Sequence, residues 1–199
     1  MTQSAPASIR DAVPDDLPAL TALYNHAVRE TTAIWNETLS DPGERGRWMD
    51  ERRATGFPVL VAEADGRVAG YGTYGPFRPH EGYRDTVENS VYVMPEQQGR
   101  GIGGALLDAL IGHAQGRGLH VMVAGIEAGN TASIALHAAR GFHLAERVQD
   151  HGSHATFVEF VGPVDVEELE AGPEVRLALL GEGPRVEVVF GPSVGVEGL

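Results

Sequence analysis

The sequence predicts a mixed α/β (α+β) protein in which an antiparallel front half precedes strand–helix–strand units. Three observations predict this fold class. Short apolar runs bounded by Gly, Pro and Asp are typical of strands. Segments with apolar residues at helical spacing separate these runs. A chain of 199 residues, of which 42% are hydrophobic, is long enough for one well-filled core and short for two full domains.

The front half should contain two helices and a strand hairpin. Pro14, Asp15 and Asp16 provide helix-start chemistry, and apolar residues recur at helical spacing after them. The Asp65-Gly66 pair is a strong hairpin turn signal, so the apolar runs on either side of it should pair antiparallel. The elements expected in this half are a strand at 8–10, helices at 16–29 and from about 41–42 to 56, and strands at 58–63 and 68–74.

A loop and further strands and helices should follow. Residues 75–84 hold two prolines and two glycines, which suit a structured loop better than a helix or strand. Gly141 follows a helical pattern and fits the left-handed residue that commonly ends a helix. The elements expected here are strands at 86–93 and 120–126, helices at 101–115 and 130–140, and final strands at 142–147 and 154–161.

The composition changes after Pro163, which divides the chain into a main domain at 1–163 and a C-terminal extension at 164–199. The extension holds eight acidic residues and two arginines. Apolar runs at 175–180 and 185–190 flank Gly-Glu-Gly-Pro, a pattern that is typical of a hairpin. A flexible acidic tail fits the same composition, and the residues alone leave both possibilities open.

Charge and composition argue against several classes of function. The 28 acidic residues outnumber 15 basic ones, all of them arginine, and the formal charge of -13 repels nucleic acid. No apolar run reaches the roughly 18 to 20 residues that span a bilayer, and the N-terminus lacks the apolar core of a signal peptide. A cytoplasmic protein without a membrane partner is therefore expected. With no cysteine, and with His151 and His154 too sparse to form a site, no metal is expected.

Gln98 to Gly104 form the sharpest local signal, a glycine-rich segment between an expected strand and an expected helix. Glycines let the backbone approach a bound group closely, and amides at a helix start can donate to a pyrophosphate. A glycine-rich turn without a ligand is the alternative. Gly99, Gly101 and Gly104 also match a dinucleotide-binding pattern. That interpretation is disfavoured because Met94 to Gln98 separate the strand from the first glycine, whereas the dinucleotide fold turns there at once.

The Q-x-x-G-x-G run of this segment, preceded by SVYVMP and followed by GALLDALI, resembles the acyl-CoA loop of the GNAT acetyltransferases. Asn130 to Ser133 and Arg140 to Phe142 resemble the downstream helix that closes on the cofactor in that family. More narrowly, YNHAV, PVLVAE, GYGTYGPFR, TVENSVYV and HVMVAGIEAGNTASIALH are similar to the phosphinothricin and methionine sulfoximine N-acetyltransferase branch. The resemblance runs from about Ile9 to Glu146 and covers most of the chain.

The resemblance implies a GNAT fold, with a mostly antiparallel twisted sheet flanked by helices and one pair of parallel strands that splay apart. Acetyl-CoA would lie in the gap between Val91–Val93 and Val121–Ala124, with its pyrophosphate on the glycine-rich segment. Arg100 is the obvious side-chain cation for a phosphate, although an arginine here fits a solvated surface as well. The residues expected at the cofactor are Val93, Met94, Gln98, Gly99, Arg100, Gly101, Ile102, Gly103, Gly104, Asn130 and Ser133.

Two residues are candidates for the proton transfers of amide formation. Glu88 on the expected strand TVENSVYV would act as general base toward the acceptor's ammonium, directly or through a water. The alternatives are a structural carboxylate or one that only binds the ammonium. His137 stands where many GNAT enzymes carry the tyrosine that protonates the departing thiolate. A packed or capped histidine explains that position equally well.

The resemblance also implies an amino-acid-like acceptor and a backbone amide near Val93 that polarises the thioester oxygen. An arginine fork matches a carboxylate or phosphinate, so Arg78 and Tyr83 in the expected loop are the natural contacts. The residues expected at the acceptor are Arg78, Tyr83, Glu88, Val91 and Tyr92. Related enzymes are commonly dimers, so a homodimer is a further expectation.

Two other functions fit the same family. One is a GNAT-fold module that senses acyl-CoA without catalysis, and the other is an N-terminal or ribosomal-protein acetyltransferase with an open peptide groove. Glu88 and the acceptor loop favour an enzyme, and a loop at 75–84 that caps a pocket favours a small acceptor. The sequence departs from the branch in its last strand, where ATFVEF stands in place of a G-R-W-L-D-L segment.

Overall fold

A computed structural model describes residues 7–34, 36–149, 156–164, 175–179 and 186–190. It confirms the mixed α/β class and has a helix or strand at every place where the sequence predicts one, with no boundary more than two residues away. The elements are β1 Ser8–Asp11, α1 Leu17–Glu30, α2 Pro42–Ala54, β2 Val59–Ala64, β3 Arg67–Pro76, β4 Thr86–Val93, α3 Ile102–Gly116, β5 Val121–Glu127, α4 Thr131–Ala138, β6 His143–Gln149, β7 Thr156–Pro163, β8 Val175–Leu179 and β9 Val186–Phe190.

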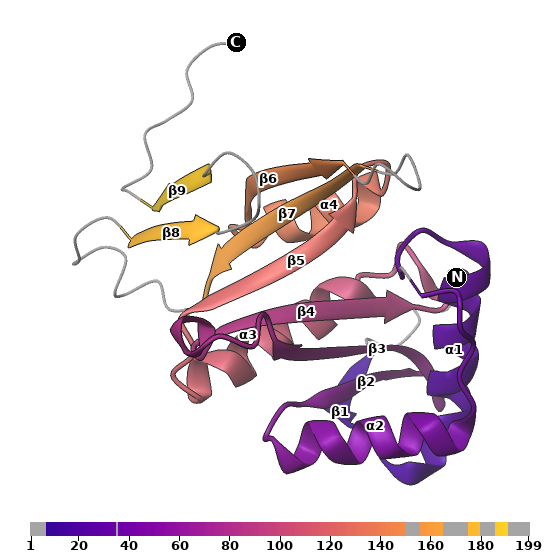
Figure 1. Ribbon diagram of the computed structural model, residues 1–199. Helices are drawn as coiled ribbons and strands as arrows, with labels where there is room; N and C mark the ends of the chain where they lie inside the picture. Colours follow the sequence, from indigo (N-terminus) through magenta and orange to yellow (C-terminus); the bar gives the residue numbers. More distant parts are fainter. Residues whose placement is uncertain (1–6, 35, 150–155, 165–174, 180–185, 191–199) are drawn as a thin grey trace.

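Seven of these strands form one sheet in the order β1-β2-β3-β4-β5-β7-β6. Neighbouring strands pair antiparallel except β4 and β5, which run parallel. In Figure 1, β5, β7 and β6 turn away from β4, so the sheet opens between the two parallel strands. The expected mostly antiparallel sheet with one splayed parallel pair is confirmed.

Two local sequence signals act as expected. Asp65 and Gly66 have φ angles of 54° and 72°, the left-handed conformation that a two-residue hairpin turn between β2 and β3 requires. At the start of α2, Glu44 N donates to Asp41 Oδ1 at 2.8 Å and Asp41 N donates to Glu44 Oε2 at 3.1 Å. This reciprocal pair satisfies two amides that the first turn of a helix otherwise leaves without partners.

Helices cover both faces of the front half of the sheet. α1 and α2 pack on one face through a cluster that includes Leu20, Met49 and Tyr71. α3 packs on the opposite face through Leu106 and Leu110, both fully buried. Because successive strand residues point to opposite faces, β4 sends alternate side chains toward α2 and toward α3.

α3 lies close to β3 because β3 carries Gly70 and Gly72. A Cβ on Gly70 would stand 3.3 Å from Leu106 Cδ1, and a Cβ on Gly72 would stand 3.1 Å from Leu110 Cδ1. A larger residue at either position would press on the helix. Because Gly70 and Gly72 have no side chains, α3 can lie close to the sheet, with its first turn beside the end of β4.

Backbone pairing of β4 with β5 covers only the first three residues of each strand and ends at Glu88 and Val123. Residues 89–93 and 124–127 therefore flank the opening. The family resemblance predicts that residues 121–124 flank the opening on the β5 side. Since 121–123 are paired with β4, the opening lies further along β5 than expected. The physical reason is that the register of two strands joined through a helix depends on long-range packing and not on either strand alone.

The described part of the C-terminal extension contains β8 and β9, which pair antiparallel as a separate two-stranded sheet. This pairing fits the expected hairpin, whose Gly-Glu-Gly-Pro connection at 181–184 lies outside the described residues. The division of the chain into a domain at 1–163 and an extension at 164–199 stays a prediction. Among the described residues, no helix has the length and apolar character that crossing a membrane requires.

Candidate active site

The opening between β4 and β5 contains a cavity of about 360 Å³. Consecutive residues of β4 line it, together with the end of β5, the inner side of α4 and the glycine-rich loop before α3. Of the residues expected at the cofactor or the acceptor, the cavity is lined by Val91, Tyr92, Val93, Gln98, Gly99, Gly101, Ile102, Gly103, Gly104, Asn130, Ser133 and His137. The expected residues that do not line it are Arg78, Tyr83, Glu88, Met94 and Arg100.

The glycine-rich loop turns sharply before α3. Gly99 and Gly101 have φ angles of 74° and 79°, which L side chains rarely adopt. The first backbone bond of α3 runs from Ala105 N to Gly101 O at 3.0 Å, so the amides of the first turn have no carbonyl partner within the helix. A Cβ on Gly99 or Gly101 would meet nothing within 4 Å, so the loop borders open space. Such amides, with the helix dipole behind them, suit a pyrophosphate.

Two residues expected at the cofactor have other contacts. The Met94 amide donates to Ala69 O at 2.9 Å, and Met94 O accepts from Gln97 N at 2.8 Å. Both backbone groups of Met94 are therefore bonded within the protein. Arg100 Nη1 lies 3.4 Å from Asp65 Oδ2 and also donates to Gln97 Oε1. The Arg100 side chain thus reaches toward the turn between β2 and β3.

α4 forms the wall of the cavity on the β5 side. Asn130 caps the helix, its Oδ1 accepting from Ser133 N at 3.1 Å. At the other end of α4, Arg140 makes a two-point ion pair with Asp108 of α3, at 2.5 and 3.0 Å. The ion pair links α3 to the turn that follows α4.

The imidazole of His137 is held between α4 and β4, and the residue is only 3% exposed. Its Nδ1 lies 2.8 Å from Ser133 O, and its Nε2 lies 3.1 Å from Asn89 Oδ1. The Phe142 ring packs edge-on with its centroid 5.0 Å away. Burial lowers the pKa of His137, the hydrogen bond to the Ser133 backbone opposes that change, and the charge of Arg140 adds to it.

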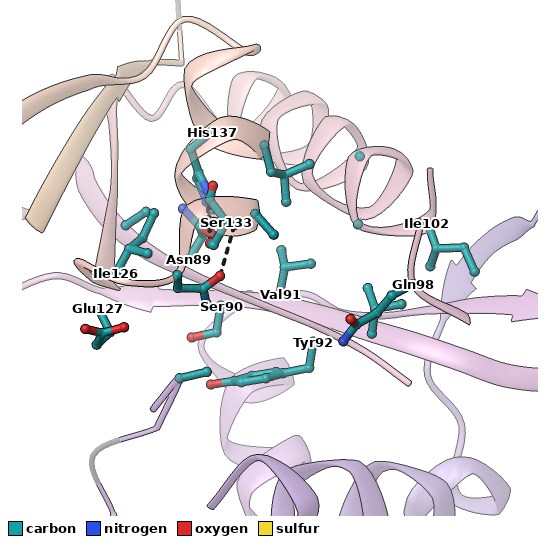
Figure 2. A pocket seen from close by; sticks show the side chains of 18 of the residues that line it. Asn89, Ser90, Val91, Tyr92, Gln98, Ile102, Ile126, Glu127, Ser133 and His137 are labelled. Carbon is teal, nitrogen blue, oxygen red and sulfur yellow. Dashed lines mark hydrogen bonds between the residues drawn. The ribbon is translucent and has the colours of Figure 1, made fainter. Parts of the chain in front are cut away.

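Asn89 belongs to the site although the sequence argument did not single it out. The side chain is buried, and its Nδ2 donates at 2.9 Å to the carbonyl oxygen of Val123, the last paired residue of β5. Figure 2 shows Asn89 and His137 pointing toward one another across the cavity wall. The available signal was the run of polar residues Glu88, Asn89 and Ser90 within a strand, which by itself does not say what each residue contacts.

Glu88 stands on the α2 side of β4, at the last paired position. The residue is exposed, and its Oε1 lies 3.2 Å from the place that a Cβ on Gly125 would take. Gly125 lines the cavity, so the Glu88 carboxylate borders it. Burial and the charge of Arg45 lower the pKa of Arg52 on α2, while the negative charge of Glu88 acts in the opposite direction.

Arg78 and Tyr83 form a cluster with Phe77 in the loop between β3 and β4. The Phe77 and Tyr83 rings meet edge-on at 5.5 Å, and the Arg78 guanidinium carbon lies 4.8 Å from the Phe77 centroid. Phe77 packs in turn against the buried cluster formed by Val121 and Val123 of β5 and Val161 of β7. The loop therefore lies at the paired end of β4 and β5, near Glu88 and away from the glycine-rich loop.

Two further lining residues, Ala33 and Glu127, were not expected in the cavity. Thr32 Oγ1 donates to Glu127 Oε2 at 3.3 Å and so links the loop after α1 to the end of β5. This contact joins residues 95 positions apart, which no local pattern can indicate. In the described part of the chain, no group of three or more His, Asp or Glu side chains could hold a metal, and His151 and His154 lie outside that part.

Known proteins are similar to this chain in sequence. The model of the acetyltransferase (GNAT) family matches residues 20–142, more than half of the chain. The L-methionine sulfoximine/L-methionine sulfone acetyltransferase of Pseudomonas paraeruginosa is 54% identical over 147 residues, covering 73% of this chain and 86% of that protein. The phosphinothricin N-acetyltransferase of Alcaligenes faecalis is 42% identical over 136 residues, covering 68% of this chain and 69% of that protein.

Solved structures share the fold. The yncA structure from Salmonella typhimurium, with its cofactor acetyl-CoA, is 42% identical with a TM-score of 0.78, covering 85% of this chain and 98% of that one. The ribosomal-protein-alanine N-acetyltransferase from Brucella melitensis is 50% identical with a TM-score of 0.75, covering 78% of this chain and 99% of that one. The family match spans the open strand pair, the glycine-rich loop and α4. The chain therefore belongs to the acetyltransferase (GNAT) family and is an acyltransferase that uses acetyl-CoA.

Proposed function

We propose that this protein transfers an acetyl group from acetyl-CoA directly to the primary amine of a small amino-acid-like acceptor. The observation that carries the proposal is the cavity between β4 and β5, with first-turn amides on one side and the Glu88 carboxylate at its border. A thioester and an amine can therefore meet at one place. The activities of two relatives, on methionine sulfoximine or sulfone and on phosphinothricin, support acceptors of these types.

Acetyl-CoA would be held by backbone groups on both sides of the opening. The amides from Gly99 to Gly104 would bind the pyrophosphate, and Val91 to Val93 would lie along the pantetheine arm. Asn130 and Ser133 would line the other side, and a backbone amide near Val93 would polarise the thioester oxygen. Holding both reactants in one cleft supplies a large part of the acceleration.

Glu88 would act as the general base toward the acceptor. The Glu88 carboxylate takes one proton from the acceptor's ammonium, directly or through a water, and the neutral amine then bonds to the thioester carbon. The nitrogen of this adduct loses its second proton to solvent. The carbon–sulfur bond then breaks and the thiolate takes a proton, for which His137 is the candidate donor because its ring lines the cavity. The position of Glu88 at the border of the cavity also suits binding of the ammonium group, so kinetics must separate the two roles.

Arg78 and Tyr83 would bind the acidic group of the acceptor. Their loop packs through Phe77 against the cluster that contains Val123, and Val123 is the β5 partner of Glu88. A guanidinium and a carboxylate at the same end of β4 match the opposite charges of an amino acid.

A peptide N-terminus is the second candidate acceptor. The observation in its favour is the 50% identity to the protein from Brucella melitensis that is described as a ribosomal-protein-alanine N-acetyltransferase. Both candidates need the same cofactor site and the same base. They differ only in whether the acceptor side is closed around a single residue or open to a chain.

An acceptor screen separates these functions. Purified protein with acetyl-CoA should release free thiol when methionine sulfoximine, methionine sulfone or phosphinothricin is added, with kcat/KM at least about 100-fold above that for peptides with alanine or serine at the N-terminus. Such a ratio corresponds to about 2.7 kcal/mol of differential binding in the transition state. Faster turnover of peptides would reverse the assignment, and no turnover of either class would remove it.

Arg100 offers a test of the phosphate site. Arg100→Ala should weaken acetyl-CoA binding about three- to tenfold, and the loss should shrink as salt rises, because an exposed cation near a phosphate is screened. Titration calorimetry at two ionic strengths measures this change. Arg29→Ala, which removes the same charge from the exposed end of α1, is the matched control and should bind acetyl-CoA normally. Equal affinities in both variants would show that Arg100 serves only the turn at Asp65.

The cellular setting of the enzyme is part of the same proposal. The formal charge of -13, which repels phosphate backbones, supports the lack of a nucleic-acid partner. A cytoplasmic location stays a prediction. A homodimer stays a prediction from the family resemblance.

A further inference from the structure

The end of the parallel pairing between β4 and β5 is held by a side chain. Backbone pairing stops at Glu88 and Val123, and the next residue of β4 is Asn89. Asn89 is 6% exposed, and its Nδ2 donates to Val123 O at 2.9 Å. A side-chain amide therefore continues the link between the strands for one more step, at the point where the cavity begins.

The same amide contacts His137. Because Val123 O can only accept, the NH2 group of Asn89 must face it, and Asn89 Oδ1 is then directed at His137 Nε2, 3.1 Å away. Ser133 O also can only accept, and it lies 2.8 Å from His137 Nδ1. Ser133 Oγ, a hydroxyl that can donate or accept, lies 3.4 Å from the same Nδ1. Nε2 faces an acceptor alone, so the contact with Asn89 Oδ1 is satisfied only when Nε2 carries a proton.

We infer that Asn89 is a positioning residue, which orients the His137 ring toward the opening between β4 and β5 and keeps Nε2 as a proton donor. Asn89 would act through His137 and would not need to touch either reactant. The inference rests on the proposed function, in which the leaving thiolate takes a proton in this cavity.

The groups around His137 determine how a substitution at Asn89 should change the pKa of His137. Arg140, which follows the end of α4, lowers the pKa of His137, but Arg140 is itself paired with Asp108 of α3. Burial is the main cause of the lowered pKa. The Ser133 backbone oxygen opposes it. Because the Asn89 oxygen also accepts from the ring, its removal should lower the pKa of His137 further, and a carboxylate in its place should raise it.

Two substitutions with opposite expected effects test the inference. In Asn89→Leu the pKa of His137 should fall by about one unit, and in Asn89→Asp it should rise by about one unit or more. Titration of the imidazole nitrogens by NMR in the ligand-free protein measures both, with His137→Gln identifying the signal. Thr73→Val is the matched control, because it removes another buried side-chain bond in the sheet, to Pro58 O at 2.7 Å, and should leave the pKa of His137 unchanged.

The pH profile of acetyl transfer provides a second measurement. A proton donor must be protonated, so kcat should fall as the pH rises through the pKa of His137, and His137→Gln should lack that limb. In Asn89→Leu this fall of kcat should occur at lower pH, and at pH values above the shifted pKa kcat should be about tenfold lower than in the wild type. In Asn89→Asp the fall should occur at higher pH.

The outcomes separate the inference from the proposed function. If the pKa of His137 moves in neither Asn89 variant, or moves as much in Thr73→Val, the inference is overturned even in an active enzyme. If His137→Gln keeps the wild-type pH profile, the donor role of His137 is wrong, and the positioning role of Asn89 is overturned with it. Should Asn89→Leu fail to fold, the Asn89→Asp variant still tests the inference, because the pKa of His137 should rise in it.

Discussion

Glu88→Gln is expected to lower kcat for amine acetylation by about 100- to 1000-fold, the usual contribution of a positioned general base. The amide is nearly the same size as the carboxylate but cannot take a proton. Acetyl-CoA affinity should stay within about twofold of the wild type, because Glu88 does not line the cavity beside the glycine-rich loop. Steady-state kinetics with a saturating acceptor and calorimetry with acetyl-CoA measure the two quantities.

The controls for Glu88→Gln distinguish a base from a binding group. Glu51→Gln makes the same chemical change at an exposed position of α2 and should leave kcat unchanged. If Glu88→Gln raises the KM of the acceptor while kcat holds, Glu88 only binds the ammonium group. Unchanged kcat and KM together would show that the Glu88 carboxylate is structural.

Gly70→Ala is expected to lower the free energy of unfolding by about 1–3 kcal/mol, the typical cost of adding a group to a filled core. The new Cβ would stand 2.6 Å from Tyr92 O and 3.3 Å from Leu106 Cδ1. Because Tyr92 O is a backbone atom, no rotamer change relieves the contact, so β3 must move away from β4. Tyr92 lines the cavity, so acetyl-CoA binding should weaken as well.

Gly112→Ala is the matched control for Gly70→Ala. Gly112 lies on the exposed side of α3, and a Cβ there would meet nothing within 4 Å. The same change should therefore raise the free energy of unfolding by about 0.5–1 kcal/mol, because alanine favours a helix over glycine. Urea denaturation of both variants measures the difference. A Gly70→Ala protein as stable as the wild type would show that the contact of β3 with β4 relaxes at no cost.

Much of the fold could be predicted from the sequence because its signals are local. Asp65-Gly66 specifies a hairpin through the φ angles of two adjacent residues. The pattern of apolar residues in α3 repeats within a few turns and indicates the face that Leu106 and Leu110 bury. The glycine-rich loop before α3 was recognisable for the same reason, since its chemistry lies within seven consecutive residues.

The candidate site was only partly predictable because its contacts join distant segments. Asn89 and His137 are 48 residues apart, and no pattern in either strand or helix indicates their hydrogen bond. Likewise the sequence could indicate that Glu88 is polar within a strand, but not that its carboxylate borders the cavity beside Gly125. Both facts follow from the register of β4 against β5, which long-range packing decides.

By itself the sequence determined the order and type of the helices and strands, the glycine-rich loop, and the acidic character of the chain, because propensity, periodicity and turn chemistry act over a few residues. Only the tertiary structure decided where the parallel strands part, at Glu88 and Val123, and which side chains meet there. The point at which two parallel strands stop pairing depends on how helices pack on both faces of the sheet. That packing is made by residues far apart in the chain.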